Sequence, residues 1–143
     1  MADIIAAIGD ADAPIALQTA PGSSAYTMHR DGDVLVCQVG STKLTYQVRA
    51  VPDLHAWLLE QGDWVPLGGA DENKAAPEGS VESWGRDEAN PVGGWYGLRK
   101  GYRGRFGVYL PPLLEHLGLV ELEHNPRNNR VRAVAAAVPA PAA

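Results

Sequence analysis

A basic stretch in the second half of the chain holds the residue types best suited to binding an anion. The segment WYGLRKGYRGRFG, residues 95–107, contains four basic residues, four glycines and four aromatic residues, and it has no acidic residue. Glycine amides together with arginine side chains can approach an anion closely, and aromatic rings beside arginine permit the stacking of bases. The segment is therefore a candidate surface for phosphate or nucleic acid, through Arg99, Lys100, Arg103 and Arg105.

The known phosphate-binding motifs do not account for this segment. Its glycines have the spacing G-x-x-x-G-x-x-G-x-x-G, whereas a Walker loop requires G-x-x-x-x-G-K-S/T and a dinucleotide fingerprint requires G-x-G-x-x-G. An alternative interpretation places the aromatic side chains in the core and the basic residues on its solvated rim. We expect a short helix or turns up to about residue 102, followed by a strand over residues 105–110.

A second group of polar and basic residues falls at the tip of a predicted hairpin. The segment LPPLLEHLGLVELEHNPRNNRVRAV predicts a short helix over 111–117, which starts at the two prolines and ends before Gly118. Two strands follow, over 119–124 and 130–135. A loop over 126–129 places Glu123 opposite Arg132, with opposite charges on one face and apolar groups on the other. The tip carries Arg127, Asn128, Asn129 and Arg130.

Two resemblances follow from these residues. The order of helix, short connection and hairpin resembles the end of a winged-helix domain, in which a helix leads into a two-stranded wing. This resemblance implies a nucleic-acid-binding wing, although a winged helix has further helices before this unit. The longer block NPVGGWYGLRKGYRGRFGVYLPPLLEHLGLVELEHNPRNNR resembles a domain of an uncharacterised bacterial family, which implies no activity.

Residue patterns typical of catalysis and of metal binding are scarce. The four histidines fall on separate predicted elements and lack the paired spacing of metal ligands. Cys37 lies inward in a predicted strand, where a thiol is usually an inert core residue. We therefore predict no catalytic residues, no metal and no cofactor, and the favoured interpretation is a protein that is not an enzyme.

The N-terminal half predicts a three-stranded antiparallel meander over residues 25–51. Two-residue turns at Asp31-Gly32 and Ser41-Thr42 place Met28 opposite Leu35 and Cys37 opposite Tyr46. Both turns direct the same alternate residues inward, which supports the assignment because a slip of one residue would invert the pattern. The predicted inward face is Tyr26, Met28, Leu35, Cys37, Val39, Leu44, Tyr46 and Val48.

Helix signals occur at three further places. Residues 2–9 can form a short helix, followed by a connector up to Ser24. Pro52 and Asp53 mark the start of a helix that ends at Gly62 and directs Trp57 toward the core. Ser80 is a candidate N-cap for a short helix that begins at residue 81.

These elements predict an α+β fold: a three-stranded antiparallel meander with a packed helix, followed by a short helix and a β-hairpin module. We expect the meander and its helix over 1–62, a linker region over 63–94, the basic module over 95–135 and a flexible tail over 136–143. One compact unit is expected, since 143 residues with 45% hydrophobic content suffice for one core.

The charge distribution suggests partners but does not select one. Residues 1–90 contain 5 basic and 14 acidic residues, a balance of −9, whereas residues 91–143 contain 7 and 3, a balance of +4. The basic part can attract an anionic partner, or the two halves can complement each other within one chain or between two copies.

Three functions stay open on the sequence. The first is nucleic-acid binding through the basic residues Arg99, Lys100, Arg103 and Arg105 and the hairpin tip. The second is a protein-interaction or regulatory domain, with self-association included. The third is a small-ligand binder or enzyme with a pocket around Trp64, Trp84 and Trp95. The N-terminus lacks the pattern of a signal peptide and no apolar run could span a membrane, so we expect a cytoplasmic protein without a membrane partner.

Overall fold

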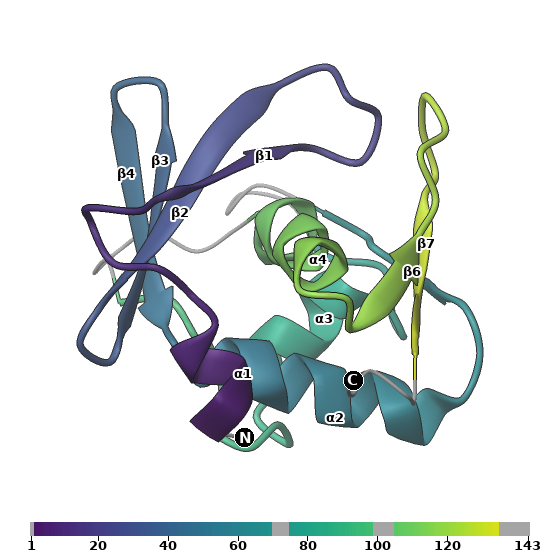
Figure 1. Cartoon of the computed structure of the whole chain (residues 1–143). Helices are drawn as coiled ribbons and strands as arrows, with labels where there is room; N and C mark the ends of the chain where they lie inside the picture. The colour runs from purple at the N-terminus through teal and green to yellow at the C-terminus, as the bar shows by residue number, and fades with distance from the viewer. Residues whose placement is uncertain (1, 70–74, 99–104, 135–143) are drawn as a thin grey trace, which may run out of the picture.

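A computed structural model of the chain describes residues 2–69, 75–98 and 105–134. The fold combines a four-stranded antiparallel sheet, a small second sheet and four helices within these ranges, which confirms the predicted α+β class (Figure 1). In chain order the elements are α1 Ala2–Ala6, β1 Ile15–Gln18, β2 Ala25–Asp31, β3 Val34–Val39, β4 Thr42–Gln47, α2 Ala50–Gln61, β5 Val65–Pro66, α3 Val81–Arg86, α4 Phe106–His116, β6 Val120–Leu122 and β7 Arg130–Ala133.

The predicted meander is present as β2, β3 and β4, and the connector before it contributes a fourth strand, β1. The predicted register is wrong by two residues at both turns: Met28 lies opposite Cys37, and Cys37 lies opposite Leu44. The turns begin at Gly32 and Gly40, with φ angles of 62° and 59°, which glycine adopts most readily.

A shift of two residues keeps every side chain on its predicted face. The inward face is therefore confirmed, with Val39 less deeply buried than the rest. Its buried members are Tyr26, Met28, Leu35, Cys37, Leu44, Tyr46 and Val48.

Helix α2 covers the core below the sheet, as its sequence signals predict. Pro52 lies in its first turn, where the missing N–H costs no helical hydrogen bond. Gly62 ends the helix in the left-handed conformation at φ 68°, and its N–H donates to the carbonyl oxygen of Leu58. Leu54 and Leu58 are fully buried, and the half-buried Trp57 packs against the core.

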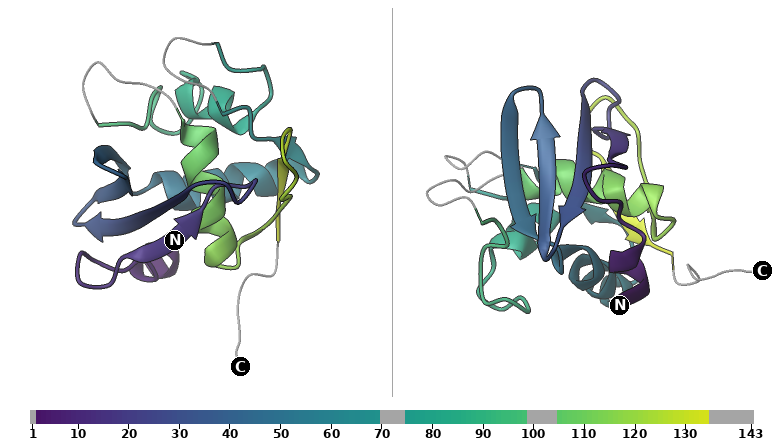
Figure 2. Two further views of the ribbon diagram at one scale, coloured as in Figure 1. Left: turned by 90° about the horizontal axis from the view of Figure 1, so that it is seen from above. Right: turned by 60° about the vertical axis from the view of Figure 1, so that its left-hand side comes forward.

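The strand expected over 105–110 and the helix start expected at Pro111 are both wrong. Residues from Phe106 to His116 form one helix, α4, with both prolines inside it. Each proline removes an i to i−4 hydrogen bond, which normally disfavours a helix. Burial outweighs this cost, because eight of the eleven residues are buried and α4 lies between the four-stranded sheet and the β6–β7 hairpin (Figure 2).

An aromatic stack joins the segments that surround α4. The rings of Trp57, Trp84, Tyr96 and Phe106 follow one another with centroid separations of 5.3, 5.3 and 5.5 Å. Tyr96 reaches this position because residues 96–98 run along the edge of β4: Gln47 N donates to Tyr96 O, and Leu98 N donates to Thr45 O. The aromatic residues at the start of the basic stretch therefore belong to the core, as the alternative interpretation expects.

The second sheet has the order β5-β7-β6, and β5 lies in the segment that the sequence assigns to a linker. The predicted register of the hairpin is wrong by two residues, since Glu121 lies opposite Arg132 and Leu122 opposite Val131. The predicted arrangement of faces survives: Val120, Leu122 and Val131 are buried, and the charged residues pair on the other face.

The end of α4 and the start of α3 follow the predicted local signals. Gly118 has φ 78° directly after the C-terminal residues of α4, and the hydroxyl oxygen of Ser80 accepts the N–H of Ser83 at the start of α3. Within the described ranges, no helix has the length and apolar character needed to cross a membrane.

Candidate anion-binding cleft at the hairpin tip

The structure brings the predicted hairpin residues into one cleft, whereas three of the four basic residues of the basic stretch lie outside the described residues. Arg99, Lys100 and Arg103 lie outside the described residues. Arg105 is described and precedes α4 in the left-handed conformation, with φ 63°, but it does not line the cleft. Arg127, Asn128 and Arg130 all line it.

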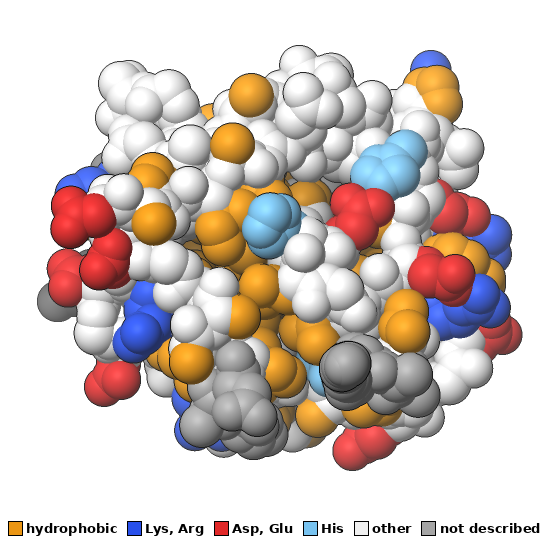
Figure 3. Space-filling view, viewed as in Figure 1, with side chains coloured by type: hydrophobic (Ala, Val, Ile, Leu, Met, Phe, Trp, Pro, Cys, Tyr) orange, Lys and Arg blue, Asp and Glu red, His pale blue; other side chains and the backbone are white. Residues whose placement is uncertain are grey.

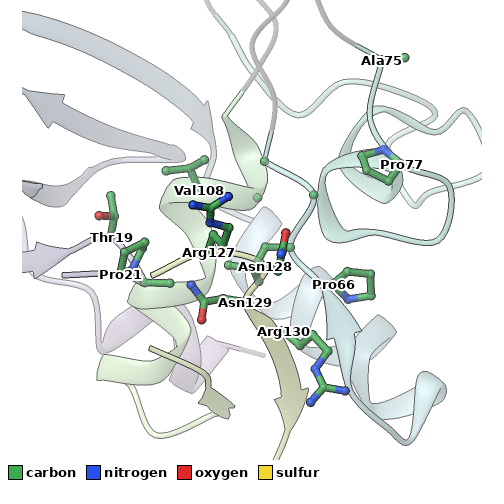
Figure 4. Close-up of a pocket in the computed structure, with 15 residues that line it drawn as sticks. Thr19, Pro21, Pro66, Ala75, Pro77, Val108, Arg127, Asn128, Asn129 and Arg130 are labelled. Atoms are coloured by element: carbon green, nitrogen blue, oxygen red, sulfur yellow. The ribbon is translucent and has the colours of Figure 1, made fainter. Parts of the chain in front are cut away.

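This hairpin-tip cleft is a cavity of about 680 Å³ between the loop after β1, the segment after β5, the first turn of α4 and the tip of the β6–β7 hairpin (Figure 4). The described lining contains two arginines and no acidic residue, so its electrostatic potential favours an anion. The lining residues are Thr19, Ala20, Pro21, Pro66, Leu67, Gly68, Gly69, Ala75, Pro77, Gly107, Val108, Arg127, Asn128, Asn129 and Arg130.

The hairpin tip is held in shape by Asn129. Its side chain is buried, accepts the N–H of Asn125 at 2.6 Å and donates to the carbonyl oxygen of Asn125 at 2.9 Å. The carbonyl oxygen of Asn129 accepts the N–H of Leu67, which joins the tip to the segment after β5. Asn128 adopts the left-handed conformation at φ 61°, which asparagine tolerates better than most residues. Asn129 therefore has a structural role, and Arg127 and Asn128 are placed at the cleft.

The arginines of the hairpin differ in how their charge is compensated. Arg130 Nη2 lies 2.7 Å from Glu123 Oε2, and its guanidinium is 5.4 Å from the ring centre of Trp64. The hydrogen bond and charge of Glu123 raise the pKa of Arg130, and those of Arg130 lower the pKa of Glu123. Arg132 pairs with Glu121 in the same way.

Arg127 is exposed and forms no ion pair with an acidic residue in the described part of the chain. Figure 4 shows its guanidinium in the middle of the cleft, whereas that of Arg130 extends away from it. Of the predicted site residues that are described, Arg127 is therefore the one best placed to meet a ligand anion.

One glycine amide of the basic stretch is already used within the protein. The N–H of Gly107 donates to Glu82 Oε1 at 2.7 Å. A carboxylate of α3 therefore accepts a backbone N–H of the first turn of α4, where N–H groups lack a partner within the helix. Glu82 is fully buried and pairs with Arg86, whose Nη2 lies 3.0 Å from Glu82 Oε2. This carboxylate occupies the place that a phosphate would need at the start of α4.

The three tryptophans proposed for a common pocket lie in different surroundings. Trp84 lines a cavity of about 270 Å³ with Asp53, Trp57 and Glu60. Trp95 packs edge-on against Tyr46 and Phe106. Trp64 lies beneath the guanidinium groups of Arg130 and Arg132 in the second sheet. The cavity at Trp84 therefore includes neither Trp64 nor Trp95.

A second cavity, of about 500 Å³, contains a histidine–carboxylate pair that sequence reasoning missed. His124 Nε2 lies 2.5 Å from Glu115 Oε2, and Nδ1 lies 2.8 Å from the carbonyl oxygen of Ala20. The hydrogen bond that the ring donates to Glu115 raises the pKa of His124. The two side chains are nine positions apart across the end of α4 and β6, a spacing with no helical or strand period. The sequence therefore offers no signal for this pair.

Cys37 has the inert environment that its predicted position indicates. Its side chain is fully buried, and burial raises the pKa of the thiol to about 12. A nucleophilic thiolate requires a lowered pKa and some exposure. The described residues also contain no group of three or more His, Cys, Asp or Glu side chains that could hold a metal ion.

The fold and this cleft define a small α+β domain with an arginine-bearing cavity at one hairpin tip. The chain belongs to the Family of unknown function (DUF6855), whose pattern matches residues 7–134. This match includes both sheets, α4 and the complete hairpin. Comparisons with curated proteins and with solved structures give no match.

Proposed function

We propose that this chain is a cytoplasmic bacterial protein without catalytic activity that binds single-stranded nucleic acid at the hairpin-tip cleft. The observation that supports this proposal most strongly is Arg127, an exposed arginine at the centre of a cleft whose described lining has no carboxylate. A guanidinium in this position can form charge-assisted hydrogen bonds to a phosphate. Asn128 and the hydroxyl of Thr19 offer further polar groups on the lining.

The shape of the cleft favours a single strand over a duplex. A cavity of about 680 Å³ lies within the roughly 300–1,000 Å³ of ligand pockets. The phosphates of a duplex lie on a convex surface, which does not enter such a cavity, whereas one flexible strand can place a phosphate and a base inside it. Pro21, Pro66 and Val108 provide apolar surface against which a base can pack.

The burial of α4 favours a contact through the hairpin, in the manner of a wing. In a winged-helix domain the helix before the wing approaches the nucleic acid, but α4 is buried along most of its length. The β6–β7 hairpin instead presents its tip loop to solvent, where residues 125–128 are exposed. The winged-helix resemblance therefore supports a role for the hairpin alone.

Fluorescence anisotropy with labelled single-stranded DNA and RNA, measured across a salt series, tests the proposal. Affinity should be highest at low salt and fall as salt rises, with a slope of about −0.7 per phosphate contact on a single strand. Arg127→Glu should lower the affinity about tenfold or more, because a charge-assisted contact becomes a repulsive one. Arg99→Glu with Arg103→Glu tests the contribution that the sequence predicts for the basic stretch.

Lys43→Glu provides the matched control. This substitution makes the same change in charge at an exposed position of β4, in the sheet that does not carry the hairpin. It should leave most of the affinity intact. Equal losses for Lys43→Glu and Arg127→Glu would show that net charge alone governs binding, and an absence of binding at low salt would refute the proposal.

A further inference from the structure

His124 connects two walls of the hairpin-tip cleft. It follows β6 and immediately precedes the tip loop that carries Arg127, while its Nδ1 lies 2.8 Å from the carbonyl oxygen of Ala20. Ala20 belongs to the loop between β1 and β2, and Thr19, Ala20 and Pro21 form the opposite wall of the cleft. Both the loop and the hairpin tip lie at the same end of the molecule (Figure 1).

Only one protonation state of His124 can form both of its contacts. A carbonyl oxygen and an ionised carboxylate can only accept hydrogen bonds, and each lies at one ring nitrogen. Both contacts therefore require two N–H groups, which only the imidazolium form has. The neutral ring must give up one of the two hydrogen bonds.

The groups around His124 make the protonated state favourable. Glu115 of α4 supplies the opposing negative charge, and the second histidine of the cavity, His116, is exposed on the same helix. Figure 3 shows two histidine side chains on either side of an acidic one on this face. Glu123, which directly precedes His124 in the chain, is already paired with Arg130. Residues 16–19 and 22, which line this cavity from β1 and the loop after it, are uncharged. Tyr26 of β2 is neutral because burial raises the pKa of its hydroxyl.

We propose that protonated His124 is a clamp that holds the loop after β1 against the hairpin and thereby sets the width of the hairpin-tip cleft. Loss of the proton removes one of the two hydrogen bonds that fix the ring and so weakens its hold on this wall of the cleft. The cleft therefore binds its anionic ligand more strongly at acidic pH than at alkaline pH. This proposal concerns the regulation of the site described above, and it rests on the proposed function for its effect on binding.

The direction of the pH effect follows from the contacts. The pKa of His124 is raised in the folded protein, first by the hydrogen bond to Glu115. The clamp is therefore fully present below about pH 6.5, the ordinary pKa of histidine, and it is lost as the pH rises through the higher folded value. A phosphodiester keeps its charge through this range, so the ligand itself does not produce the change.

The geometry of the same pair favours a holding role over a catalytic one. A general base needs a ring nitrogen that faces its substrate, but both nitrogens of His124 are occupied by protein oxygens. The pair is therefore suited to holding two segments together.

The clamp is tested by measuring oligonucleotide affinity between pH 5.5 and 9 at constant ionic strength. The unchanged protein should lose affinity by about fivefold across the range, the scale of an exposed charge pair. His124→Gln should bind weakly at every pH, and Glu115→Gln should move the midpoint to lower pH. His116→Gln is the matched control, and it should keep both the affinity and the pH profile. A flat profile for the unchanged protein that nevertheless binds would overturn the clamp and leave the binding proposal standing.

Two measurements without nucleic acid separate failure of the clamp from failure of the binding proposal. The ¹H NMR titration of the His124 ring should give a pKa above the ordinary histidine value, and a pKa at or below that value would overturn the clamp. Amide-exchange protection factors for residues 19–24 should fall as the pH rises through this pKa, and they should be low at all pH values in His124→Gln. If the protection factors do not depend on pH, no clamp exists, whether or not an oligonucleotide binds.

Discussion

At the scale of single residues, the partner of a charged side chain decides what that side chain can do. Arg130 and Arg132 pair with Glu123 and Glu121, so the hairpin compensates their charges internally. Arg127 lies three positions before Arg130 and faces the cleft instead. The sequence assigned Arg127 and Arg130 the same role, because the pairing depends on a register that it placed two residues away.

A substitution of Glu82 tests, at this scale, whether a buried charged residue stabilises the fold. Glu82→Gln should lower the free energy of unfolding by about 3 kcal/mol, because it removes a buried negative charge that contacts both Arg86 and the N–H of Gly107. The side chains of Glu82 and Arg86 are only 0% and 10% exposed, so water cannot replace the lost partner. Urea unfolding measures the change.

Glu78→Gln serves as the control for Glu82→Gln, since Glu78 is an exposed acidic residue just before α3. Its removal should change the free energy of unfolding by less than about 0.5 kcal/mol. Similar small losses for both variants would contradict the role given to Glu82.

At the scale of elements, local signals marked the helix ends at Gly62 and Gly118 correctly, placed both turns of the meander one residue away, and failed where packing decides the structure. Gly62, Ser80 and Gly118 mark element ends in the structure, because each acts through its own backbone or the next few residues. The double proline in α4 is also a local signal, and the burial of this helix overrides it. Strands β1 and β5 have only four and two residues, too few for a clear alternation. Their assignment depends on partners elsewhere in the chain.

The contact between α3 and α4 gives an element-scale test. A Cβ atom at Gly85 would lie 2.7 Å from the ring of Phe106, so the two helices approach closely because this position has no side chain. Gly85→Ala should lower the free energy of unfolding by about 1–3 kcal/mol through overpacking, measured by urea unfolding.

Phe106→Leu distinguishes overpacking from an effect of glycine on the helix itself. The smaller side chain should destabilise the protein alone and should reduce the additional cost of Gly85→Ala in the double variant. Strictly additive changes in free energy would contradict a direct contact between the two positions.

At the scale of the whole molecule, the cleft is built from segments that lie far apart in the sequence. Its tip residues were predictable because a hairpin places its loop residues together. The opposite walls, from Thr19–Pro21 and Gly68–Gly69, come together only through the packing of both sheets around α4. The sequence therefore predicted the arginine and asparagine of the tip but not the cavity that they line.

The net charge of −5 sets the conditions under which the proposed binding is measurable. The net charge of the protein repels a nucleic acid, whereas local positive charge such as that of Arg127 at the cleft attracts it. At low ionic strength the Debye length is long, so both the repulsion by the net charge and the attraction by the local positive charge act over a longer distance. A titration that runs from low to moderate salt therefore separates the long-range repulsion from the contact at the cleft.

The most direct test of the central claim is an NMR titration of ¹⁵N-labelled protein with a short single-stranded oligonucleotide. The largest amide shifts should cluster at residues 19–20, 67–69 and 127–130, and they should disappear in Arg127→Glu while the rest of its spectrum remains that of the folded protein. Shifts confined to the exposed face of the four-stranded sheet, or no shifts at low salt, would contradict the account.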